Sequence, residues 1–179
     1  MPLEIEIKVK IKNKKRLLNK FAILGIHNRN KKHYVDIYYS PKNGKRFISF
    51  KSPRMRIRKD LTSGTASFEY HMPSGIYGGH EREIDISDGD MMDVILKHLD
   101  FIEEVRVDKI RSYYEYKNFN IFIDDVKALG SFLEVEIMNA KNRKSAIQQI
   151  KGLLDDLGVG KDIVQDWYWR MMLEKKHLL

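Results

Sequence analysis

The chain has 179 residues, of which 42% are hydrophobic and 32% charged, with no cysteine and a formal net charge of +8. This length and composition predict one globular domain over residues 1–179 and exclude disulfides and thiolate metal sites. There is no run of 18 apolar residues and no signal-peptide pattern, which predicts a cytoplasmic protein without a membrane span. The positive charge favours a polyanionic partner, although solvated surface lysines would give the same total.

Residues 3–11, LEIEIKVKI, alternate strictly and predict a strand. Its odd positions are apolar and face one way, and its even positions are charged and face the other way. Such a strand either exposes its charged face to water or turns it toward a charged ligand. A helix is predicted over 12–25, with Asn13 as its N-cap and Gly25 as its stop.

The rest of the chain is predicted to be mostly strands in hairpins, with helices between and after them. The strands are predicted over 33–40, 54–60, 65–73, 78–87, 103–116, 119–126 and 131–138, and the helices over 88–101, 144–158 and 162–176. An antiparallel sheet of this size tends to curl and close, which removes its edges. The prediction is therefore an α+β fold, with an eight-stranded antiparallel β-barrel and helices packed outside it and at the C-terminus.

Charged residues recur at i, i+2 spacing on these strands, in short blocks of one sign. The carboxylate blocks are Glu4 and Glu6, Glu81 with Glu83 and Asp85, Asp124, and Glu134 with Glu136; the cationic ones are Lys8, Arg56 with Arg58, and Lys109 with Arg111. Exposed rows of weak ion pairs explain any one strand equally well. If these faces are enclosed, burying the charged side chains is costly unless they pair with one another or bind ions. Carboxylates suit Mg²⁺ or Mn²⁺ and the cations suit phosphate, so the pattern fits a metal polyphosphate.

The segment EIEIK at 4–8 resembles the ExExK signature of the CYTH superfamily, the triphosphate tunnel metalloenzymes. HYVDIYYS, RMRIRKD, EREIDI, VDKIRSYY and IFIDDVKALGSFLEVEI follow the family's order over nearly the whole chain. The most specific piece is DDVKALGSFLEVE, which resembles the block D-x-V-x-x-L-G-x-F-x-E-x-E. The tyrosine-rich strand, basic loop and R-x-R are most similar to class IV adenylyl cyclases and their archaeal relatives. The resemblance implies an eight-stranded barrel whose lumen holds a nucleotide or inorganic triphosphate.

The resemblance also implies roles for single residues. Glu4, Glu6, Glu134 and Glu136 would coordinate one or two Mg²⁺ or Mn²⁺ ions with Asp124 nearby; Lys8, Arg56, Arg58, Lys109 and Arg111 would hold the phosphates; and Glu4, Glu6, Lys8 and Glu136 would be catalytic. Glu83 and Asp85 would face the lumen in support. His71 stands where the family usually has a lysine, and Glu69 replaces a neutral residue. His71 could still donate to a phosphate, or be structural in a site that has changed its substrate or lost activity.

Three functions stay open on the sequence. The resemblance favours a class IV adenylyl cyclase, which converts ATP to cyclic AMP and pyrophosphate. A triphosphatase acting on tripolyphosphate, thiamine triphosphate or a nucleoside triphosphate would use the same cavity. A non-catalytic binder of polyphosphate or nucleic acid is the third, because aromatic and basic residues mix at 31–39 and 110–118, but the carboxylate blocks disfavour nucleic acid. The aromatic cluster at 166–172 would pack on the outer surface, against a second copy in a homodimer, or over one mouth of the tunnel.

Overall fold

The computed structural model describes residues 4–44, 49, 52–73 and 78–176, which contain nine strands and four helices. The strands are β1 (Glu4–Lys10), β2 (Asn28–Pro41), β3 (Arg54–Asp60), β4 (Thr65–Pro73), β5 (Gly78–Ile86), β6 (Phe101–Tyr116), β7 (Phe119–Val126), β8 (Gly130–Ile137) and β9 (Ile163–Val164). The helices are α1 (Lys14–Leu24), α2 (Gly89–His98), α3 (Arg143–Asp156) and α4 (Tyr168–Lys175). None of these helices is both long and apolar enough to cross a membrane.

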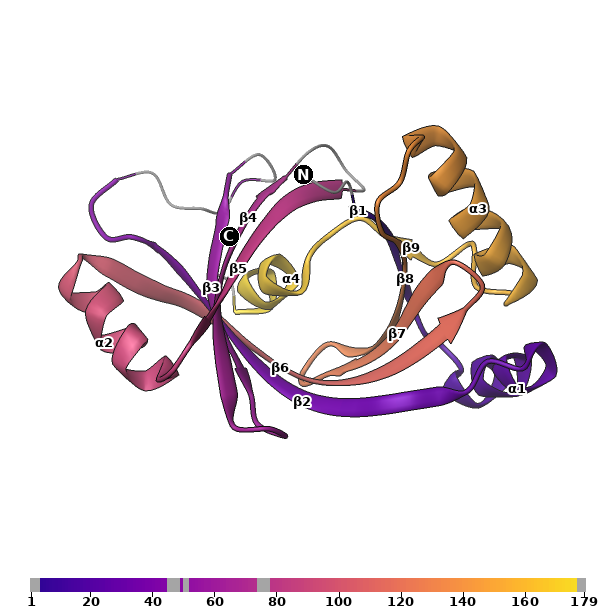
Figure 1. Cartoon of the computed structure of the whole chain (residues 1–179), viewed down its shortest axis with the longest axis horizontal. Helices are drawn as coiled ribbons and strands as arrows, with labels where there is room; N and C mark the ends of the chain where they lie inside the picture. Colours follow the sequence, from indigo (N-terminus) through magenta and orange to yellow (C-terminus); the bar gives the residue numbers. More distant parts are fainter. Residues whose placement is uncertain (1–3, 45–48, 50–51, 74–77, 177–179) are drawn as a thin grey trace.

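The strands form one antiparallel sheet in the order β5-β4-β3-β2-β6-β7-β8-β1-β9. The sheet curls until β5 also meets β1, through the pairs Glu4–Gly79 and Ile5–Gly78. Eight strands therefore surround an interior space, as Figure 1 shows. The predicted α+β fold with eight antiparallel strands is confirmed. The seam between β5 and β1 is short, so the sheet is a strongly curled tunnel rather than an evenly paired cylinder.

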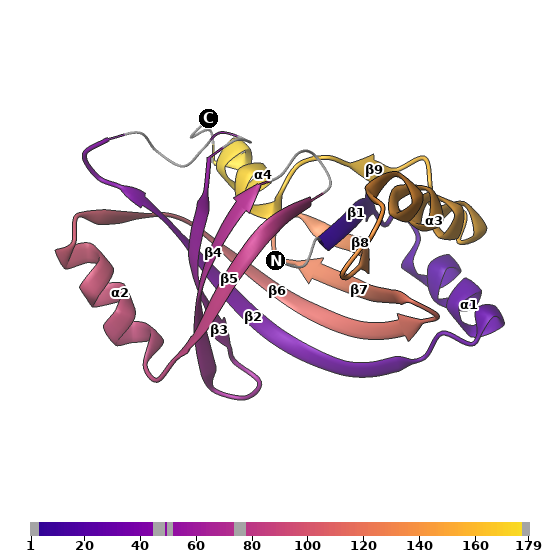
Figure 2. The same cartoon turned by 45° about the horizontal axis from the view of Figure 1, so that its top comes forward.

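Three helices cover the outside of the sheet, at two separate ends (Figure 2). α1 and α3 pack on β1, β7 and β8, where Ile7 contacts a core that includes Phe21 and Ile150. α2 packs on β2 and β3 through Leu96, in a cluster with Ile37. The apolar positions of β1 thus face the helices, and its charged positions are left to face the interior. Both faces of this strand are therefore enclosed. Of the two options for its charged face, exposure to water or an interior position, the structure has the interior position.

The C-terminal segment differs from the prediction. Instead of one helix over 162–176, residues Ile163–Val164 form β9, which pairs with β1, and α4 begins only at Tyr168. α4 lies across the opening of the curled sheet (Figure 1). Its residues Trp169 and Leu173 pack on Val107 of the inner face of β6. Of the three placements considered for the aromatic cluster, the one over a tunnel mouth is observed, and packing on the outer surface is wrong.

The hairpin between β7 and β8 explains the glycine of the D-x-V-x-x-L-G block. Gly130 begins β8 with φ +95°, a conformation that other residues rarely adopt. A Cβ at this position would also lie 3.0 Å from Nζ of Lys10. The glycine therefore allows the tight return that sets Glu134 and Glu136 beside β1.

Candidate active site

The interior of the curled sheet holds a polar cavity of about 280 Å³. This volume lies at the low end of the sizes typical of small-molecule sites. The cavity is lined by Glu4, Glu6, Lys8, Tyr38, Arg54, Arg56, Arg58, Glu69, His71, Glu81, Lys109, Arg111, Glu134, Glu136, Met138, Trp167, Tyr168 and Trp169. Seven strands and the start of α4 contribute to it, so the site depends on the sheet curling as it does.

One side of the cavity is a group of carboxylates, Glu4, Glu6 and Glu136, which we call the acidic wall. Glu6 of β1 lies directly opposite Glu136 of β8 in the strand register, an arrangement that is destabilising for two like charges. Burial and the neighbouring carboxylates raise the pKa of each of the three from 4.5 to about 7. None of the three forms an ion pair with any residue in the described segments. The acidic wall therefore carries negative charge that the described protein leaves uncompensated.

The second group, which we call the β6–β8 cluster, consists of Lys8, Lys109, Arg111, Asp124 and Glu134. Arg111 donates to both oxygens of Asp124 at 2.7 and 2.6 Å, and Lys109 Nζ lies 3.0 Å from Asp124 Oδ2. Arg111 also contacts Glu134, and Lys8 Nζ lies 3.3 Å from Glu134 Oε1. Burial raises the pKa of Asp124, but Arg111 and Lys109 more than offset it, so the net pKa is lowered. The pKa of Glu134 is lowered in the same way, by Arg111 and Lys8.

The third group, which we call the β2–β4 cluster, consists of Asp36, Arg56, Arg58, Glu69 and Glu81. Arg58 grips Asp36 through two hydrogen bonds of 2.7 and 2.9 Å. Arg56 donates through Nε to Glu69 Oε2 at 2.5 Å and through Nη2 to Glu81 Oε1 at 3.2 Å. Burial raises the pKa of Asp36, but Arg58 and Arg56 outweigh it and the net pKa is lowered. Both clusters thus hold arginines that line the cavity in fixed orientations.

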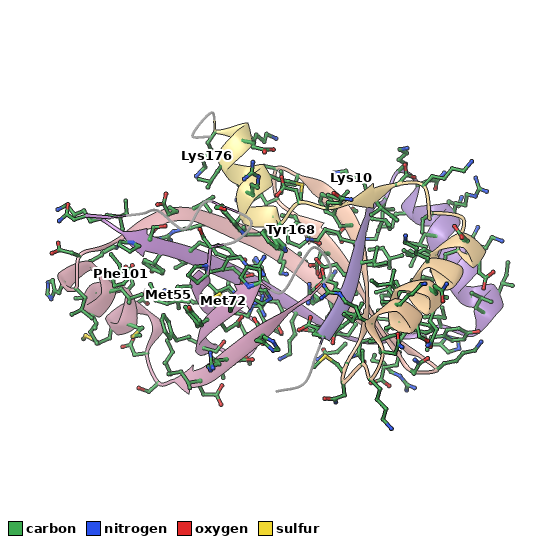
Figure 3. The ribbon with its side chains drawn as sticks, turned by 90° about the horizontal axis from the view of Figure 1, so that it is seen from above. Lys10, Met55, Met72, Phe101, Tyr168 and Lys176 are labelled. Carbon is green, nitrogen blue, oxygen red and sulfur yellow. The ribbon has the colours of Figure 1, made fainter. Side chains whose placement is uncertain are left out.

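The start of α4 closes one side of the cavity. The ring of Tyr168 lies against two cations, with Lys8 Nζ at 4.0 Å and Lys109 Nζ at 5.1 Å from its centroid. Figure 3 places Tyr168 at the end of α4 that faces the strands. Trp167 stacks with Trp169, whose indole Nε1 is buried without a hydrogen-bond partner among the described residues. Because an indole nitrogen only donates, this group favours an acceptor atom within the cavity.

The donor set of the acidic wall fits a divalent cation. Carboxylate oxygens are the ligands that Mg²⁺ and Mn²⁺ prefer, and a cation would relieve the repulsion between Glu6 and Glu136. Within the described ranges no three acidic or histidine side chains converge closely enough to hold a metal by themselves. Mg²⁺ commonly binds through one or two carboxylates plus waters and substrate phosphates. An ion here would therefore share its coordination with the substrate.

Most of the predicted site residues come together in this cavity. Ten of them line it: Glu4, Glu6, Lys8, Arg56, Arg58, His71, Lys109, Arg111, Glu134 and Glu136. Asp124 does not; it is fully buried behind Arg111 and Lys109. Glu83 and Asp85 are exposed and outside the lining, because β5 pairs with β1 only at its first residues. Both share a face of β5 with the cavity residue Glu81, so their supporting role at the lumen stays a prediction.

A family model described as the CYTH domain matches residues 2–161, which includes every strand from β1 to β8. The chain belongs to the CYTH family. Enzymes of this family depend on divalent metal ions and bind triphosphate substrates. α4 begins after the last residue matched by the CYTH model, so the aromatic side chains that it adds to the cavity lie outside the matched part.

The chain is also similar to individual proteins and solved structures over most of its length. A protein of Methanocaldococcus jannaschii, provisionally named an adenylate cyclase, is 29% identical over 178 residues, which cover 89% of this chain and 92% of that protein. A solved structure from Pyrococcus horikoshii OT3 is 25% identical with a TM-score of 0.82, covering 96% of this chain and 99% of that one. A provisionally named adenylyl cyclase from Hippeastrum, described as having a dominant triphosphatase activity, is 12% identical with a TM-score of 0.69, covering 100% of this chain and 97% of that one.

Several residues in or next to the cavity of this CYTH protein were not predicted as site residues. Asp36 and Tyr38 face the interior from β2, and the alternation of DIYY could have indicated them, since Asp36 shares a face with Tyr38. Glu69 was noticed only as a departure from the family pattern. Arg54 precedes the R-x-R motif by two residues and shares the face of Arg56. Tyr168 belongs to the aromatic cluster at 166–172, but its exact place in the cavity depends on how α4 crosses the opening.

Proposed function

We propose that this protein is a divalent-metal-dependent enzyme that acts on a triphosphate bound in the tunnel. The observation that carries the proposal is the acidic wall. Glu6 and Glu136 face each other across β1 and β8, neither is ion-paired within the described residues, and six lysines and arginines line the same cavity. A site built only to bind an anion has no use for these carboxylates. A metal–triphosphate complex needs both kinds of group in one cavity.

In this proposal the metal is Mg²⁺ or Mn²⁺, held by Glu4, Glu6 and Glu136 with Glu134 close by. When bound, the ion would supply positive charge next to the reacting phosphorus and its oxygens. The protein's own residues would do the remaining work of binding and orientation. Asp124 would act indirectly, because its hydrogen bonds to Lys109 and Arg111 orient them toward the cavity.

The phosphates would lie along the cations of the two ion-pair clusters. Arg56 and Arg58 would bind from β3, and Lys109 and Arg111 from β6, with Lys8 between the acidic wall and Tyr168. Each arginine has five N–H donors, so a contact with a carboxylate leaves others for phosphate oxygens. These cations would neutralise the charge that grows on the leaving group as a bond to phosphorus breaks.

The reaction that we propose first is that of an adenylyl cyclase. The ribose 3′-oxygen of ATP forms a bond to the α-phosphorus, the bond from that phosphorus to the β-phosphate oxygen breaks, and the hydroxyl proton passes to solvent. The products are cyclic AMP and pyrophosphate. Support comes from the R-x-R pattern of this subfamily and from the name of the M. jannaschii relative.

Triphosphate hydrolysis is the second candidate, and the small polar cavity favours it. About 280 Å³ lined mainly by charged side chains suits a phosphate chain better than a whole nucleotide. A cytoplasmic location and a homodimer are predictions of the sequence that accompany either reaction. A non-catalytic binder of polyphosphate is the outcome that remains if neither reaction occurs.

The test is incubation of the pure protein with ATP, tripolyphosphate and thiamine triphosphate, each with Mg²⁺, with Mn²⁺ and with a chelator, followed by separation of the products. Cyclic AMP and pyrophosphate from ATP would support the cyclase. Orthophosphate would support the triphosphatase. Absence of every product with both metals would overturn the enzymatic proposal, and equal turnover with the chelator would overturn the metal's part in it.

A further inference from the structure

Arg54 occupies a position in the cavity that no motif predicts. It is the first residue of β3 and lies directly opposite His71 of β4 in the strand register. His71 stands where the family pattern has a lysine, so the chain lacks that cation on β4. Arg54 provides a cation on the neighbouring strand at the same level of the cavity.

The contacts of Arg54 are unlike those of the other cations in the cavity. Its guanidinium lies over the ring of Trp167, 3.7 Å from the centroid, and a guanidinium nitrogen lies 3.0 Å from Nε2 of His71. Every other lysine or arginine that lines the cavity forms an ion pair with a carboxylate. Arg54 forms none with any residue in the described part of the chain.

The charge of Arg54 is therefore available to a ligand. Burial lowers the pKa of Arg54 to about 10, which leaves it protonated at neutral pH. Burial, together with Arg54 and Arg56, lowers the pKa of His71 to about 3, so the imidazole is neutral and can accept a hydrogen bond from the guanidinium. A half-buried cation without an anion is unfavourable unless a ligand supplies one.

We propose that Arg54 binds a phosphate of the substrate, in place of the lysine that the family carries at the position of His71. In this arrangement His71 and Trp167 are positioning residues. His71 accepts a hydrogen bond from the guanidinium of Arg54, and the ring of Trp167 packs against the flat face of that guanidinium. The inference rests on the proposed function for the nature of the anion. It adds a binding residue and assigns a use to the departure from the family pattern.

The alternative is that Arg54 only ties β3 to α4 through Trp167. The two roles differ in what a lysine at position 71 would do. If Arg54 supplies phosphate-binding charge, a lysine on the opposite strand can replace it. If Arg54 is a purely structural link to α4, that lysine restores nothing.

The experiment measures binding of bis-methylene tripolyphosphate, which cannot be hydrolysed at its bridges, by calorimetry in the presence of Mg²⁺. The variants are Arg54→Gln, His71→Lys, and the double variant with both changes. The matched control is Arg82→Gln, which removes the same charge from an exposed position of β5 outside the cavity lining. A thermal unfolding curve of each variant confirms that the fold is retained.

We expect Arg54→Gln to weaken binding roughly ten- to hundredfold, the effect of losing one hydrogen bond to a charged group. The double variant should return to within about threefold of wild type, and the Arg82→Gln control should stay within about twofold. Unchanged binding by Arg54→Gln, or a double variant no better than Arg54→Gln, would overturn the inference.

Two further outcomes remain informative. If Arg54→Gln fails to fold, the binding affinity of His71→Lys tests the inference instead. A second cation next to Arg54 should tighten binding of the analogue several-fold. Unchanged or weaker binding by His71→Lys would contradict the inference. If the wild-type protein does not bind the analogue at all, the proposed function fails first. Binding by the wild type with no effect of Arg54→Gln rejects only the role of Arg54.

Discussion

Glu134 and Glu136 lie two residues apart on the same face of β8, yet their pKa values move in opposite directions. Both are buried, which raises the pKa of each. At Glu134, Arg111 and Lys8 outweigh burial and the net pKa is lowered. At Glu136, Glu6 adds to burial and the pKa rises to about 7. The difference comes from the partners in the strand register, Lys8 opposite one and Glu6 opposite the other.

This comparison separates the residues that hold the tunnel together from those that are left unsatisfied. The β6–β8 cluster has anions and cations in contact, so breaking it leaves a buried charge without a partner. The acidic wall has anions alone, so removing one of them relieves repulsion. Strain of this kind is typical of functional sites, where a ligand supplies the missing partner. The two groups should therefore respond to mutation in opposite ways.

The largest effect is expected from Asp124→Asn. This change leaves Lys109 and Arg111 buried without their carboxylate and should lower the free energy of unfolding by about 3–5 kcal/mol. Urea unfolding measures it. The matched control is Asp125→Asn, at the next position of β7. Asp125 contacts the half-exposed Lys14 and Ser131, so this change should lower the free energy of unfolding by about 1 kcal/mol or less. Equal stability of the two variants would refute the structural role of Asp124.

Glu136→Gln should have the opposite signature. Turnover of the triphosphate should fall at least about a hundredfold, the scale of losing one group that organises charge at the reacting centre. The fold should be as stable as wild type or more so, because a like charge opposite Glu6 is gone. Product formation with Mg²⁺ and a thermal unfolding curve measure the two effects.

The matched control for Glu136→Gln is Glu134→Gln, two residues away on the same face of β8. It should destabilise the protein by leaving Lys8 and Arg111 short of an anion. A fully active Glu136→Gln variant would remove Glu136 from the metal site. A Glu134→Gln variant as stable as wild type would show that the two glutamates do not differ in the way proposed here.

A third effect is a pH dependence. The pKa of Glu136 is about 7 in the folded state, against an ordinary value of 4.5. Between pH 4.5 and 7 the folded state therefore binds more protons than the unfolded state. Because of this difference, Glu136 lowers the stability of the fold increasingly as pH rises from 4.5 to 7. His71 acts in the opposite direction up to pH 6.5, because its folded-state pKa is lowered to about 3. The contribution of Glu136 is therefore best seen as a difference between variants.

The stability advantage of Glu136→Gln over wild type should grow by up to about 1 kcal/mol for each pH unit from 4.5 to 7 and then level off. Urea unfolding at pH 5, 6, 7 and 8 in the presence of a chelator measures it. Excess Mg²⁺ should reduce the difference, since the ion stabilises the ionised wild-type wall. A difference that is flat with pH would mean that Glu136 titrates normally.

The strands and the composition of the site follow from the sequence because both depend on period-2 alternation. Ile5, Ile7 and Val9 mark one face of β1, and the charges between them mark the other. The N-cap at Asn13 was also predicted, and its side chain accepts a hydrogen bond from the first turn of α1. Local pattern is sufficient wherever the neighbours that matter are near in sequence.

Long-range placement is where the sequence prediction falls short. The C-terminal aromatic segment reads as one helix by its spacing, but Ile163 and Val164 pair with β1 instead. That pairing needs an edge of β1 that only the folded sheet provides. In the same way, alternation with Arg56 puts Arg54 on the inner face of β3, but its contact with Trp167 depends on where the chain enters α4, which no local pattern can indicate.

Glu83 gives the smallest expected effect and the sharpest contrast with the acidic wall. It pairs in register with Glu69, as the alternation of β5 predicts. It is nevertheless exposed because, in the part of the chain that the structure describes, β5 pairs on its other side only at Gly78 and Gly79. A carboxylate that water solvates needs no cation. Glu83→Gln should therefore leave turnover within about twofold of wild type and change stability by less than about 0.5 kcal/mol. A loss of turnover comparable to that of Glu136→Gln would mean that β5 and β1 pair further along in the working enzyme, bringing Glu83 into the tunnel.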